Sequence, residues 1–446
     1  MKCVILAAGK GTRMRTRGEI KPLVPLLGIP LIERVIRTVK DVVDEIYVVT
    51  GYKRERVEEF LKKFSEREKI KISTIYNAEW ERENGYSVLK AKDVVKETFL
   101  LIMGDHLFDL SIIKDLLNTK INEDEVILAV DTFLQNPLVN LQDVTKVKID
   151  KDGNILNIGK TIKDYNCYDT GIFLCTPKIF WAIEESIKRY NDYTLSGGIK
   201  ILSQKKLAKS FDIKKRFWID VDDALALKKA EDVILDQIRN KASDGPISRY
   251  INRPFSIRIS KALVNYSITP NQISLFSFFL SILSFLSFFY GRSYFSLLLG
   301  GCLAQISSII DGCDGEIARL KFLKSDFGGW FDAVLDRYAD GIILFGMSWY
   351  GYQIFHDPFL FFIGFLAIIG SYVLSYTADK YDNLMIKKLQ NGQYLRIGRD
   401  VRIFLVFLFC ILNKVKIGLT VIALIMNIET FRRICLFYRH ERNKFF

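Results

Sequence analysis

The chain has little of what builds a disulfide-stapled or zinc-ribbon protein. Its 446 residues include seven cysteines, an odd number without closely spaced pairs, and three histidines. These counts exclude a disulfide framework and a zinc ribbon, so we expect free, buried thiols. The opening run MKCVILAAGKG lacks a small-residue cleavage site. It therefore predicts a strand instead of a signal peptide, and a first half that stays in the cytoplasm.

Long apolar runs are missing before residue 270 and frequent after it. The chain is also about twice as long as one comfortable hydrophobic core, so it should divide. We predict a cytosolic domain over residues 1–242, a linker with an interfacial helix over 243–270 and a membrane domain over 271–446. The net charge is +13, and the larger share lies after residue 250. This charge suits lipid headgroups and phosphate-bearing substrates, and no nucleic-acid partner is expected.

In the first half, short β-branched runs alternate with amphipathic stretches. The pattern predicts an α/β, Rossmann-like domain with a mixed, mostly parallel sheet. The predicted strands are Cys3–Leu6, Glu45–Thr50, Ile72–Tyr76, Thr98–Met103 and Glu125–Val130. The predicted helices are Leu31–Lys40, Arg54–Phe64, Ser111–Leu117 and Ala224–Ile238. Asp152-Gly153 predicts a hairpin between Val144–Ile149 and Ile155–Ile158, which adds antiparallel strands at one side.

The second half is predicted to be an all-α membrane domain of six helices. Before it, Ile247–Val264 carries apolar residues at every fourth position against basic ones, including Arg253. This predicts an amphipathic helix on the cytoplasmic leaflet, with an exposed linker helix as the alternative. The predicted spans are Ile273–Tyr290, Tyr294–Ile310, Ala333–Ile354, Phe359–Thr377, Ile403–Leu412 with extensions, and Ile417–Ile428 extended to about Ile434. Lys and Arg are concentrated in residues 379–402 and 432–444, so both termini should lie on the cytoplasmic side of the cell (inner) membrane.

A glycine-rich loop directly follows the first strand. Its glycines let backbone N–H groups approach a polyphosphate, and Lys10 and Arg13 neutralise its charge. The pattern is neither GxGxxG nor a Walker A loop, which disfavours a dinucleotide cofactor and a P-loop ATPase. Lys21-Pro22 places a further cation beside a rigid turn. The residues expected to bind a nucleotide here are Leu6, Ala7, Ala8, Gly9, Lys10, Gly11 and Thr12.

Carboxylates follow or end two of the strands of this domain. Asp105 comes after the fourth predicted strand, at the carboxyl end where such sheets bind ligands. In Trp218–Asp222 the period of two puts Asp220 and Asp222 on one face. We expect Asp220 to be the second carboxylate of the site that contains Asp105, and Asp222 is the alternative.

The glycine-rich loop, Arg13 and the Lys21-Pro22 pair together resemble the opening of the sugar-1-phosphate nucleotidyltransferase family. The resemblance implies that Asp105 and either Asp220 or Asp222 hold one Mg²⁺ ion, and that Arg13 and Lys21 are catalytic cations. The implied contacts are Asn84, Gly85 and Ser87 with the nucleotide, and Lys160, Asp169 and Gly171 with the acceptor. The implied reaction is in-line attack of an alcohol phosphate on the α-phosphate of a nucleoside triphosphate, which needs no nucleophilic side chain.

The strongest pattern in the chain is a set of four carboxylates after residue 310. Asp311 and Asp314 are three residues apart and Asp332 and Asp336 four apart, so each pair shares a helix face. Four carboxylates at the end of a membrane helix would repel one another unless they bound cations. Their number and oxygen donors favour two Mg²⁺ ions, with Mn²⁺ as the alternative. The spacing excludes an EF-hand.

The run D-x-x-D-G-x-x-A-R, followed by G-x-x-x-D-x-x-x-D, resembles the signature of the CDP-alcohol phosphotransferase family. The resemblance implies that Asp311, Asp314 and Asp332 hold metals, and that Asp336 is a ligand or the general base on the acceptor hydroxyl. The residues implied to make room for or contact the nucleotide are Gly315, Ala318, Arg319 and Gly328. The candidates for binding the acceptor phosphate are Lys380, Arg399 and Arg402. Basic residues that only mark the cytoplasmic interface are an equally weighted alternative.

The fusion of these halves resembles the bifunctional inositol-1-phosphate cytidylyltransferase and di-myo-inositol phosphate phosphate synthase family of hyperthermophiles, which serves compatible-solute biosynthesis. The resemblance implies CTP and inositol-1-phosphate as substrates, CDP-inositol as intermediate, and a homodimer through the membrane domain. One alternative is a phospholipid synthase that uses a CDP-lipid or CDP-choline-type donor. Another is a membrane carrier that binds nucleotide without turnover.

Overall fold

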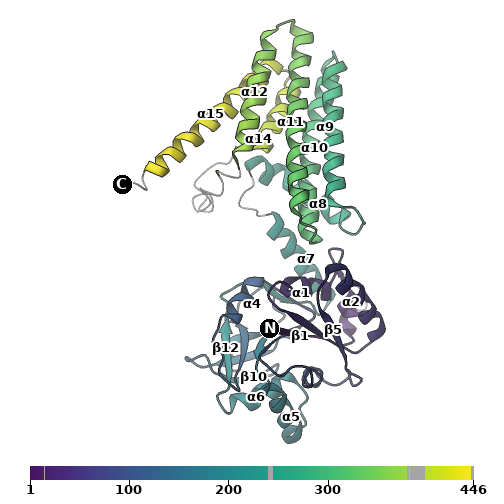
Figure 1. Cartoon of the computed structure of the whole chain (residues 1–446), viewed down its shortest axis with the longest axis vertical. Coiled ribbons are helices and arrows are strands. Elements are labelled where there is room, and N and C mark those ends of the chain that lie inside the picture. The colour runs from purple at the N-terminus through teal and green to yellow at the C-terminus, as the bar shows by residue number, and fades with distance from the viewer. Residues whose placement is uncertain (15, 240–244, 379–380, 382–396, 443–446) are drawn as a thin grey trace. The chain divides into compact units, whose positions relative to one another are not determined.

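The structure is a computed structural model that describes residues 1–14, 16–239, 245–378, 381 and 397–442. The chain divides into two compact units, Met1–Val233 and Ile234–Phe446. The first unit is a mixed α/β structure and the second is helical (Figure 1).

A nine-stranded sheet organises the first unit, in the order β10-β9-β11-β6-β1-β4-β5, with β8 paired to β11 and β12 paired to β8. The strands are β1 (Lys2–Ala7), β4 (Glu45–Thr50), β5 (Ile72–Tyr76), β6 (Phe99–Met103), β8 (Val126–Asp131), β9 (Lys146–Ile149), β10 (Ile155–Gly159), β11 (Cys167–Cys175) and β12 (Ala208–Asp212). The neighbours β6, β1, β4 and β5 run parallel, whereas β11 is antiparallel to β6. The predicted mixed α/β sheet is confirmed, and so is the antiparallel hairpin of β9 and β10.

Two short sheets accompany the large one. They pair β2 (Pro25–Leu26) with β3 (Ile29–Pro30), and β7 (His106–Phe108) with β13 (Trp218–Asp220). The helices are α1 (Leu31–Val39), α2 (Arg54–Glu68), α3 (Asn84–Leu89), α4 (Leu110–Leu117), α5 (Lys178–Tyr190), α6 (Leu195–Ser203) and α7 (Ala224–Arg239). The sequence pattern predicted α1, α2, α4 and α7 and missed α5 and α6.

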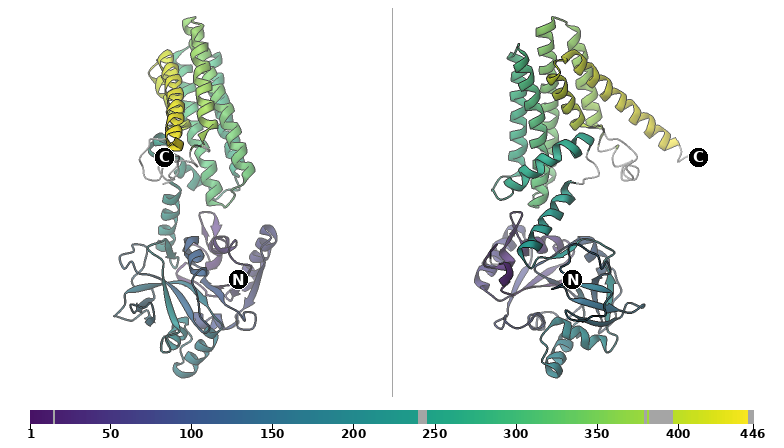
Figure 2. Two further views of the ribbon diagram at one scale, coloured as in Figure 1. Left: turned by 60° about the vertical axis from the view of Figure 1, so that its left-hand side comes forward. Right: turned by 180° about the vertical axis from the view of Figure 1, so that it is seen from behind.

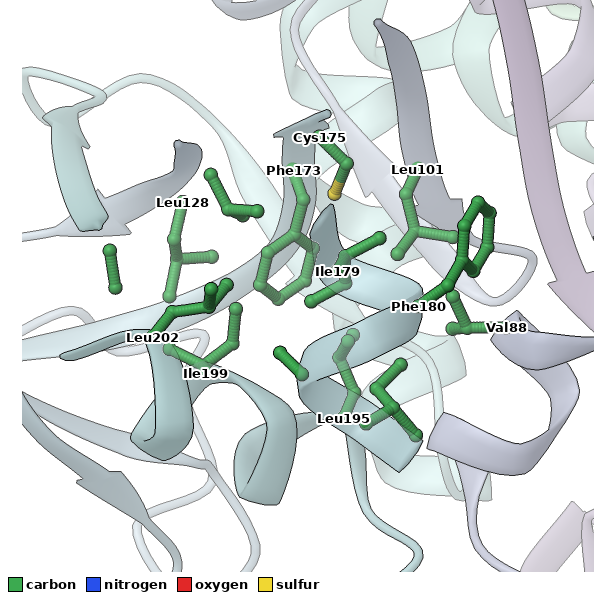
Figure 3. Packing of buried hydrophobic residues seen from close by; sticks show 14 of the residues in the cluster. Val88, Leu101, Leu128, Phe173, Cys175, Ile179, Phe180, Leu195, Ile199 and Leu202 are labelled. Carbon is green, nitrogen blue, oxygen red and sulfur yellow. The ribbon is translucent and has the colours of Figure 1, made fainter. Parts of the chain in front are cut away.

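One hydrophobic core of the first unit lies where α5 and α6 pack on the sheet (Figure 3). Phe173 of β11 and Leu128 of β8 are buried in one cluster with Ile179 and Leu202 from these helices. Apolar contacts therefore hold strand β11 on both sides of Asp169 and Gly171, which lie within it.

In the second unit, all six predicted spans are helices (Figures 1 and 2). They are α9 (Pro270–Tyr290), α10 (Tyr294–Leu320), α11 (Asp326–Phe355), α12 (Phe359–Tyr376), α14 (Arg399–Ile411) and α15 (Val415–Arg442). Capping boxes start two of them: Thr269 with Gln272 begins α9, and Ser293 with Ser296 begins α10. Helices α9 and α10 approach closely at Gly300, where a Cβ would collide with the ring of Phe288.

Three helices are long and apolar enough to cross a membrane among the residues that the structure describes: Pro270–Tyr290, Tyr294–Leu320 and Phe359–Tyr376. The other three predicted spans, α11, α14 and α15, are not both long and apolar enough by the same comparison. Helix α11 carries four aspartates, and α14 has 13 residues. At about 1.5 Å per residue, such a helix covers roughly 20 Å of the ~30 Å hydrocarbon core. The chain is thus a membrane protein with three clear span candidates.

The segment before α9 is helical, as a π-helix over Ser248–Asn252 and then α8 (Arg253–Leu263). Its apolar Phe255 is 53% exposed. The charge pattern placed Arg253 on the polar outer face, and this prediction is wrong. Arg253 is buried, with its Nη1 atom 2.6 Å from Oε1 of Glu316 on α10, because an ion pair inside the unit satisfies its charge.

Candidate active sites

The first site is built where β6 ends and the small β7–β13 sheet begins. Asp105 follows β6, and its carbonyl accepts a hydrogen bond from Val221 N at 3.0 Å. In the antiparallel β7–β13 pair, His106 stands opposite Asp220. Backbone pairing thus brings together acidic segments that lie far apart in the sequence.

Asp105, His106 and Asp220 form a cluster whose ligand atoms all lie within 4.8 Å of one another. His106 Nδ1 is 2.8 Å from Asp105 Oδ1 and 3.7 Å from Asp220 Oδ1. Asp220 Oδ1 is buried and has no hydrogen-bond partner. Because an unsatisfied buried carboxylate oxygen is unfavourable, this donor set fits a divalent cation.

Lys21 is the buried cation beside this cluster. Its Nζ atom donates to Asp105 Oδ2 at 2.5 Å and also to Asp222 Oδ1. Gly11 has a φ of +61°, and a Cβ at this position would collide with the side chain of Lys21. The glycine therefore lets the loop close over the lysine.

Asp222 differs from Asp220 in its partners. Arg13 Nη2 lies 2.8 Å from Asp222 Oδ2, and Arg13 Nη1 lies 2.5 Å from Asp143 Oδ2. The other oxygen of Asp143 is 2.6 Å from Lys160 Nζ. Asp222 thus pairs with the side chains of Arg13 and Lys21. Asp220 instead belongs to the cluster with Asp105 and His106 that could hold a metal ion. Asp143 links the loop cation to the predicted acceptor lysine.

The electrostatics of the cluster reflect its crowded carboxylates. Burial alone would raise the pKa of Asp105. The neighbouring cations Lys21 and His106 together outweigh burial and hold this pKa well below its usual range. Burial and the charges of Asp105 and Asp222 raise the pKa of Asp220 to about 7, against the opposing effect of His106. Burial lowers the pKa of His106, but Asp220 and Asp105 outweigh it and raise the value to about 9. The site therefore attracts positive charge.

Most of the predicted first-site residues surround two cavities. A cavity of about 780 Å³ is lined by Leu6, Ala8, Gly9, Asn84, Ser87, Asp105, Lys160, Asp169, Gly171, Asp220 and Asp222, among others. A cavity of about 310 Å³ is lined by Leu6, Ala7, Gly9, Gly11, Thr12, Arg13, Lys21, Asp105 and Asp222, among others. Lys10 and Gly85 line neither. Lys10 Nζ lies 5.3 Å from the ring centre of Tyr52, and Gly85 fits against the backbone of Tyr193 and Thr194.

Asp169 and Gly171, which were predicted to contact the acceptor, line the larger cavity. Burial raises the pKa of Asp169 to about 6, and its Oδ1 accepts a 2.7 Å hydrogen bond from Gly171 N. Gly171 has a φ of +73°, and a Cβ there would lie 2.7 Å from His106 Cδ2. The absence of a side chain at Gly171 thus provides the space for the His106 ring.

The second candidate site joins α10 and α11. Ligand oxygens of Asp311, Asp314 and Asp332 lie within 4.8 Å of one another. Ser274 and Ser277 of α9 donate to Asp314 Oδ2 at 2.6 Å and to Asp311 Oδ1 at 3.2 Å. Asp332 Oδ1 is buried without a hydrogen-bond partner. Three converging carboxylates with an unsatisfied oxygen again fit divalent cations.

Arg399, at the start of α14, lies between the carboxylates of this site. Its Nη1 atom is 2.6 Å from Asp311 Oδ2 and 2.6 Å from Asp336 Oδ1, and its Nε atom is 3.2 Å from Asp340 Oδ1. Asp340 also pairs with Arg402, and both of these side chains are fully buried. A cavity of about 310 Å³ is lined by Arg253, Asp311, Asp336 and Arg399, among others, but not by Arg402.

Asp314 and Asp332 do not line this cavity, and neither do the remaining predicted residues of the second site that the structure describes. Gly315, Ala318 and Arg319 are on α10, and Gly328 is in the first turn of α11. A Cβ at Gly328 would lie 3.0 Å from Ser325 Oγ and 3.4 Å from Asn271 Oδ1. Lys380 lies outside the described residues.

Several residues of these sites were missed by the sequence analysis. His106 is adjacent to Asp105 and is one of only three histidines, a signal that could have found it. Asp143 and Glu316 carry no such signal, because their partners are distant in sequence. Sequence spacing identifies neighbours on one helix or strand, whereas these pairs join different elements.

Comparison with known proteins covers the whole chain. A MobA-like NTP transferase domain matches residues 3–143, and a CDP-alcohol phosphatidyltransferase model matches residues 267–431. The bifunctional IPC transferase and DIPP synthase of Aquifex aeolicus is 34% identical, with 99% of each chain covered. The chain belongs to the bifunctional IPC transferase and DIPP synthase family. The family resemblance of the fused halves is thereby confirmed.

Two further proteins resemble separate parts of this family member. The archaetidylinositol phosphate synthase of Pyrococcus horikoshii is 32% identical over 40% of this chain and 87% of its own length. The solved inositol-1-phosphate CTP transferase from T. maritima is 25% identical over 52% of this chain and 94% of that chain, with a TM-score of 0.46.

Proposed function

We propose that this member of the IPC transferase and DIPP synthase family catalyses two consecutive transfers. CTP and inositol-1-phosphate give CDP-inositol and pyrophosphate. CDP-inositol and a second inositol-1-phosphate then give di-myo-inositol phosphate phosphate and CMP. The observation that carries the proposal is the match over 99% of both chains to a bifunctional relative. The two metal-type clusters, one in each unit, support it.

In the first site, the residues have distinct tasks. The loop through Gly9 and Gly11 offers backbone N–H groups to the triphosphate, and Arg13 and Lys21 neutralise its charge. Lys160 attracts the phosphate of inositol-1-phosphate, which is the nucleophile. Asp169, close to the cavity wall, accepts hydrogen bonds from inositol hydroxyls. The chain thus orients two anions against each other, and no side chain needs to form a covalent bond.

Asp105 and Asp220 are the proposed ligands of one Mg²⁺ ion in this site. The unsatisfied Oδ1 atom of Asp220 and the depressed pKa of Asp105 support this role. When bound, the ion offsets the negative charge that develops around the α-phosphate. Asp222 is better suited to hold Arg13 and Lys21, since it pairs with both.

In the second site, Asp311, Asp314 and Asp332 are the proposed ligands of two Mg²⁺ ions, with Mn²⁺ as the alternative. Asp336 accepts the proton of the attacking inositol hydroxyl or completes the ligand set. Arg399 reaches the cavity and binds the acceptor phosphate, a task that suits its planar guanidinium. Arg402 was predicted to share that task, but its complete burial against Asp340 favours a supporting role. CMP leaves as the new phosphodiester forms.

The setting of the second site is proposed as follows. The helices α9, α10, α11, α12, α14 and α15 form a six-span domain, with both termini on the cytoplasmic side and the interfacial helix on the cytoplasmic leaflet. The proposed boundaries remain 1–242, 243–270 and 271–446. We also propose a homodimer through the membrane domain.

A phospholipid synthase is the second candidate. It is favoured by one observation, the 32% identity of the second half to an archaetidylinositol phosphate synthase. In that case a CDP-lipid would be the donor at the second site and inositol-1-phosphate the acceptor. The full-length match favours the soluble product.

Two variants test the two-site proposal. Asp105→Asn should abolish formation of CDP-inositol from CTP, while transfer from supplied CDP-inositol continues. Asp336→Asn should let CDP-inositol accumulate and stop the second transfer. Asp115→Asn, an exposed carboxylate on α4, and Asp357→Asn, an exposed one before α12, are the matched controls. Equal loss of both activities in either site variant would contradict separate sites.

A further inference from the structure

We propose that His106 is the third protein ligand of the metal ion in the first site. The ion would then be held by one imidazole nitrogen and two carboxylates, from Asp105 and Asp220. Among the described residues, the cluster of the second site consists of carboxylates, so the two sites of one chain would differ in metal preference. This inference rests on the proposed metal-dependent cytidylyl transfer in the first unit.

The distances within the cluster fit a shared ion. Neighbouring ligands of an octahedral ion with bonds of about 2.1 Å lie about 3.0 Å apart, and opposite ligands about 4.2 Å. His106 Nδ1 lies 2.8 Å from Asp105 Oδ1 and 3.7 Å from Asp220 Oδ1. Asp220 Oδ1 has no hydrogen-bond partner of its own. All three side chains are partly exposed to the cavity, which leaves positions for phosphate oxygens.

The surroundings hold the imidazole in this orientation. On one side the ring stacks on Trp218, with ring centroids 6.4 Å apart and an interplanar angle of 20°. The backbone of His106 is fixed opposite Asp220 by the β7–β13 pair. Gly171, whose Cβ would lie 2.7 Å from His106 Cδ2, leaves the ring its space. The nitrogen is therefore preorganised toward the carboxylates and does not need to turn for an ion to bind.

The donor type has a chemical consequence. Imidazole nitrogen suits transition metals such as Mn²⁺ and Co²⁺ better than Mg²⁺, whereas carboxylate oxygens suit Mg²⁺ well. A metal ion binds Nδ1 of His106 only when this nitrogen carries no proton. Binding of the ion therefore displaces the proton that otherwise forms the hydrogen bond with Asp105. The first site should therefore prefer Mn²⁺ over Mg²⁺ more strongly than the cluster of Asp311, Asp314 and Asp332.

Electron spin-echo spectroscopy of bound Mn²⁺ tests the ligand directly, because a coordinated imidazole ¹⁴N modulates the echo. The sample is the full-length chain in detergent, with Mn²⁺ and CTP. The Asp332→Asn background weakens Mn²⁺ binding at the second site. The other two histidines of the chain, His356 and His440, lie in the second unit. His106→Asn is the test variant, and His356→Asn is the matched control.

We expect the modulation of a directly bound nitrogen in the parent and in His356→Asn, and its loss in His106→Asn. Mn²⁺ affinity at the first site should fall at least about tenfold in His106→Asn. Two results would overturn the proposal. In the first, Asp220→Asn abolishes Mn²⁺ binding, which places the ion in the first site, but the parent shows no nitrogen modulation. In the second, no Mn²⁺ binds at this site. Formation of CDP-inositol by the parent is measured in parallel, in one sample with Mg²⁺ and in another with Mn²⁺. If it occurs without nitrogen modulation, only the ligand assignment fails; if it is absent, the proposed function fails.

Discussion

Replacing Asp340 by Asn removes the charge that faces two buried guanidinium groups. Asp340 and Arg402 both have exposed side-chain fractions of 0%, and Asp340 also lies 3.2 Å from Arg399. Breaking a buried ion pair from one side leaves an uncompensated charge, so we expect a loss of about 3–5 kcal/mol in unfolding free energy. For a unit of this size, the melting temperature should fall by roughly 6–20 °C. Thermal unfolding in detergent measures this.

The same substitution should separate the two activities. Arg399 loses the partner at its Nε atom, so transfer from CDP-inositol should fall at least about tenfold, which corresponds to about 1.4 kcal/mol. Formation of CDP-inositol should not change. The double variant Asp340→Leu with Arg402→Met removes both charges and should recover most of the melting temperature without recovering the second transfer. Asp340→Asn with parental stability and parental second transfer would refute the reasoning.

Four other perturbations follow from the two sites. Arg253→Ala leaves the fully buried Glu316 carboxylate without its ion-pair partner and should lower the unfolding free energy by about 3–5 kcal/mol, as measured by thermal unfolding. Replacing both Arg253 and Glu316 by Met should largely restore this stability. Gly171→Ala meets both a φ of +73° and the ring of His106, so CDP-inositol formation should drop at least about tenfold while transfer from supplied CDP-inositol persists. With a pKa of about 6, Asp169 gains a proton as the pH falls through that value. The KM for inositol-1-phosphate should therefore rise below pH 6, and this rise should be absent in Asp169→Asn. Removal of divalent metal with EDTA should stop both transfers, and added Mg²⁺ should restore both, as followed by release of pyrophosphate and CMP.

Local patterns predicted much of the fold. The alternation of β-branched runs with amphipathic stretches located β1, β4, β5, β6 and β8, because strand and helix periods differ. The spacing of Asp311 and Asp314 predicted that both carboxylates lie on one face of a helix, and their oxygens lie within 4.8 Å of each other on α10. These features depend on residues close in sequence, where the periodicity of one helix or strand determines which side chains share a face.

The partners across elements could not be predicted in this way. Arg253 has the spacing of an outer-face residue on α8, but its side chain is buried because it forms an ion pair with Glu316 of α10. Asp340 pairs with Arg402, 62 residues later in the chain. Periodicity carries no information on which helices become neighbours, so only the packed structure reveals such pairs. For His106 the strand pairing of β7 with β13 was the missing step.

Phosphorus NMR of the detergent-solubilised chain with CTP, Mg²⁺ and inositol-1-phosphate, in the absence of any lipid substrate, tests the central claim most directly. The two-site account predicts that pyrophosphate, CMP and a new phosphodiester appear together from these substrates alone. Pyrophosphate without CMP, followed by CMP only after a CDP-lipid is added, would contradict it and establish the second site as a lipid synthase.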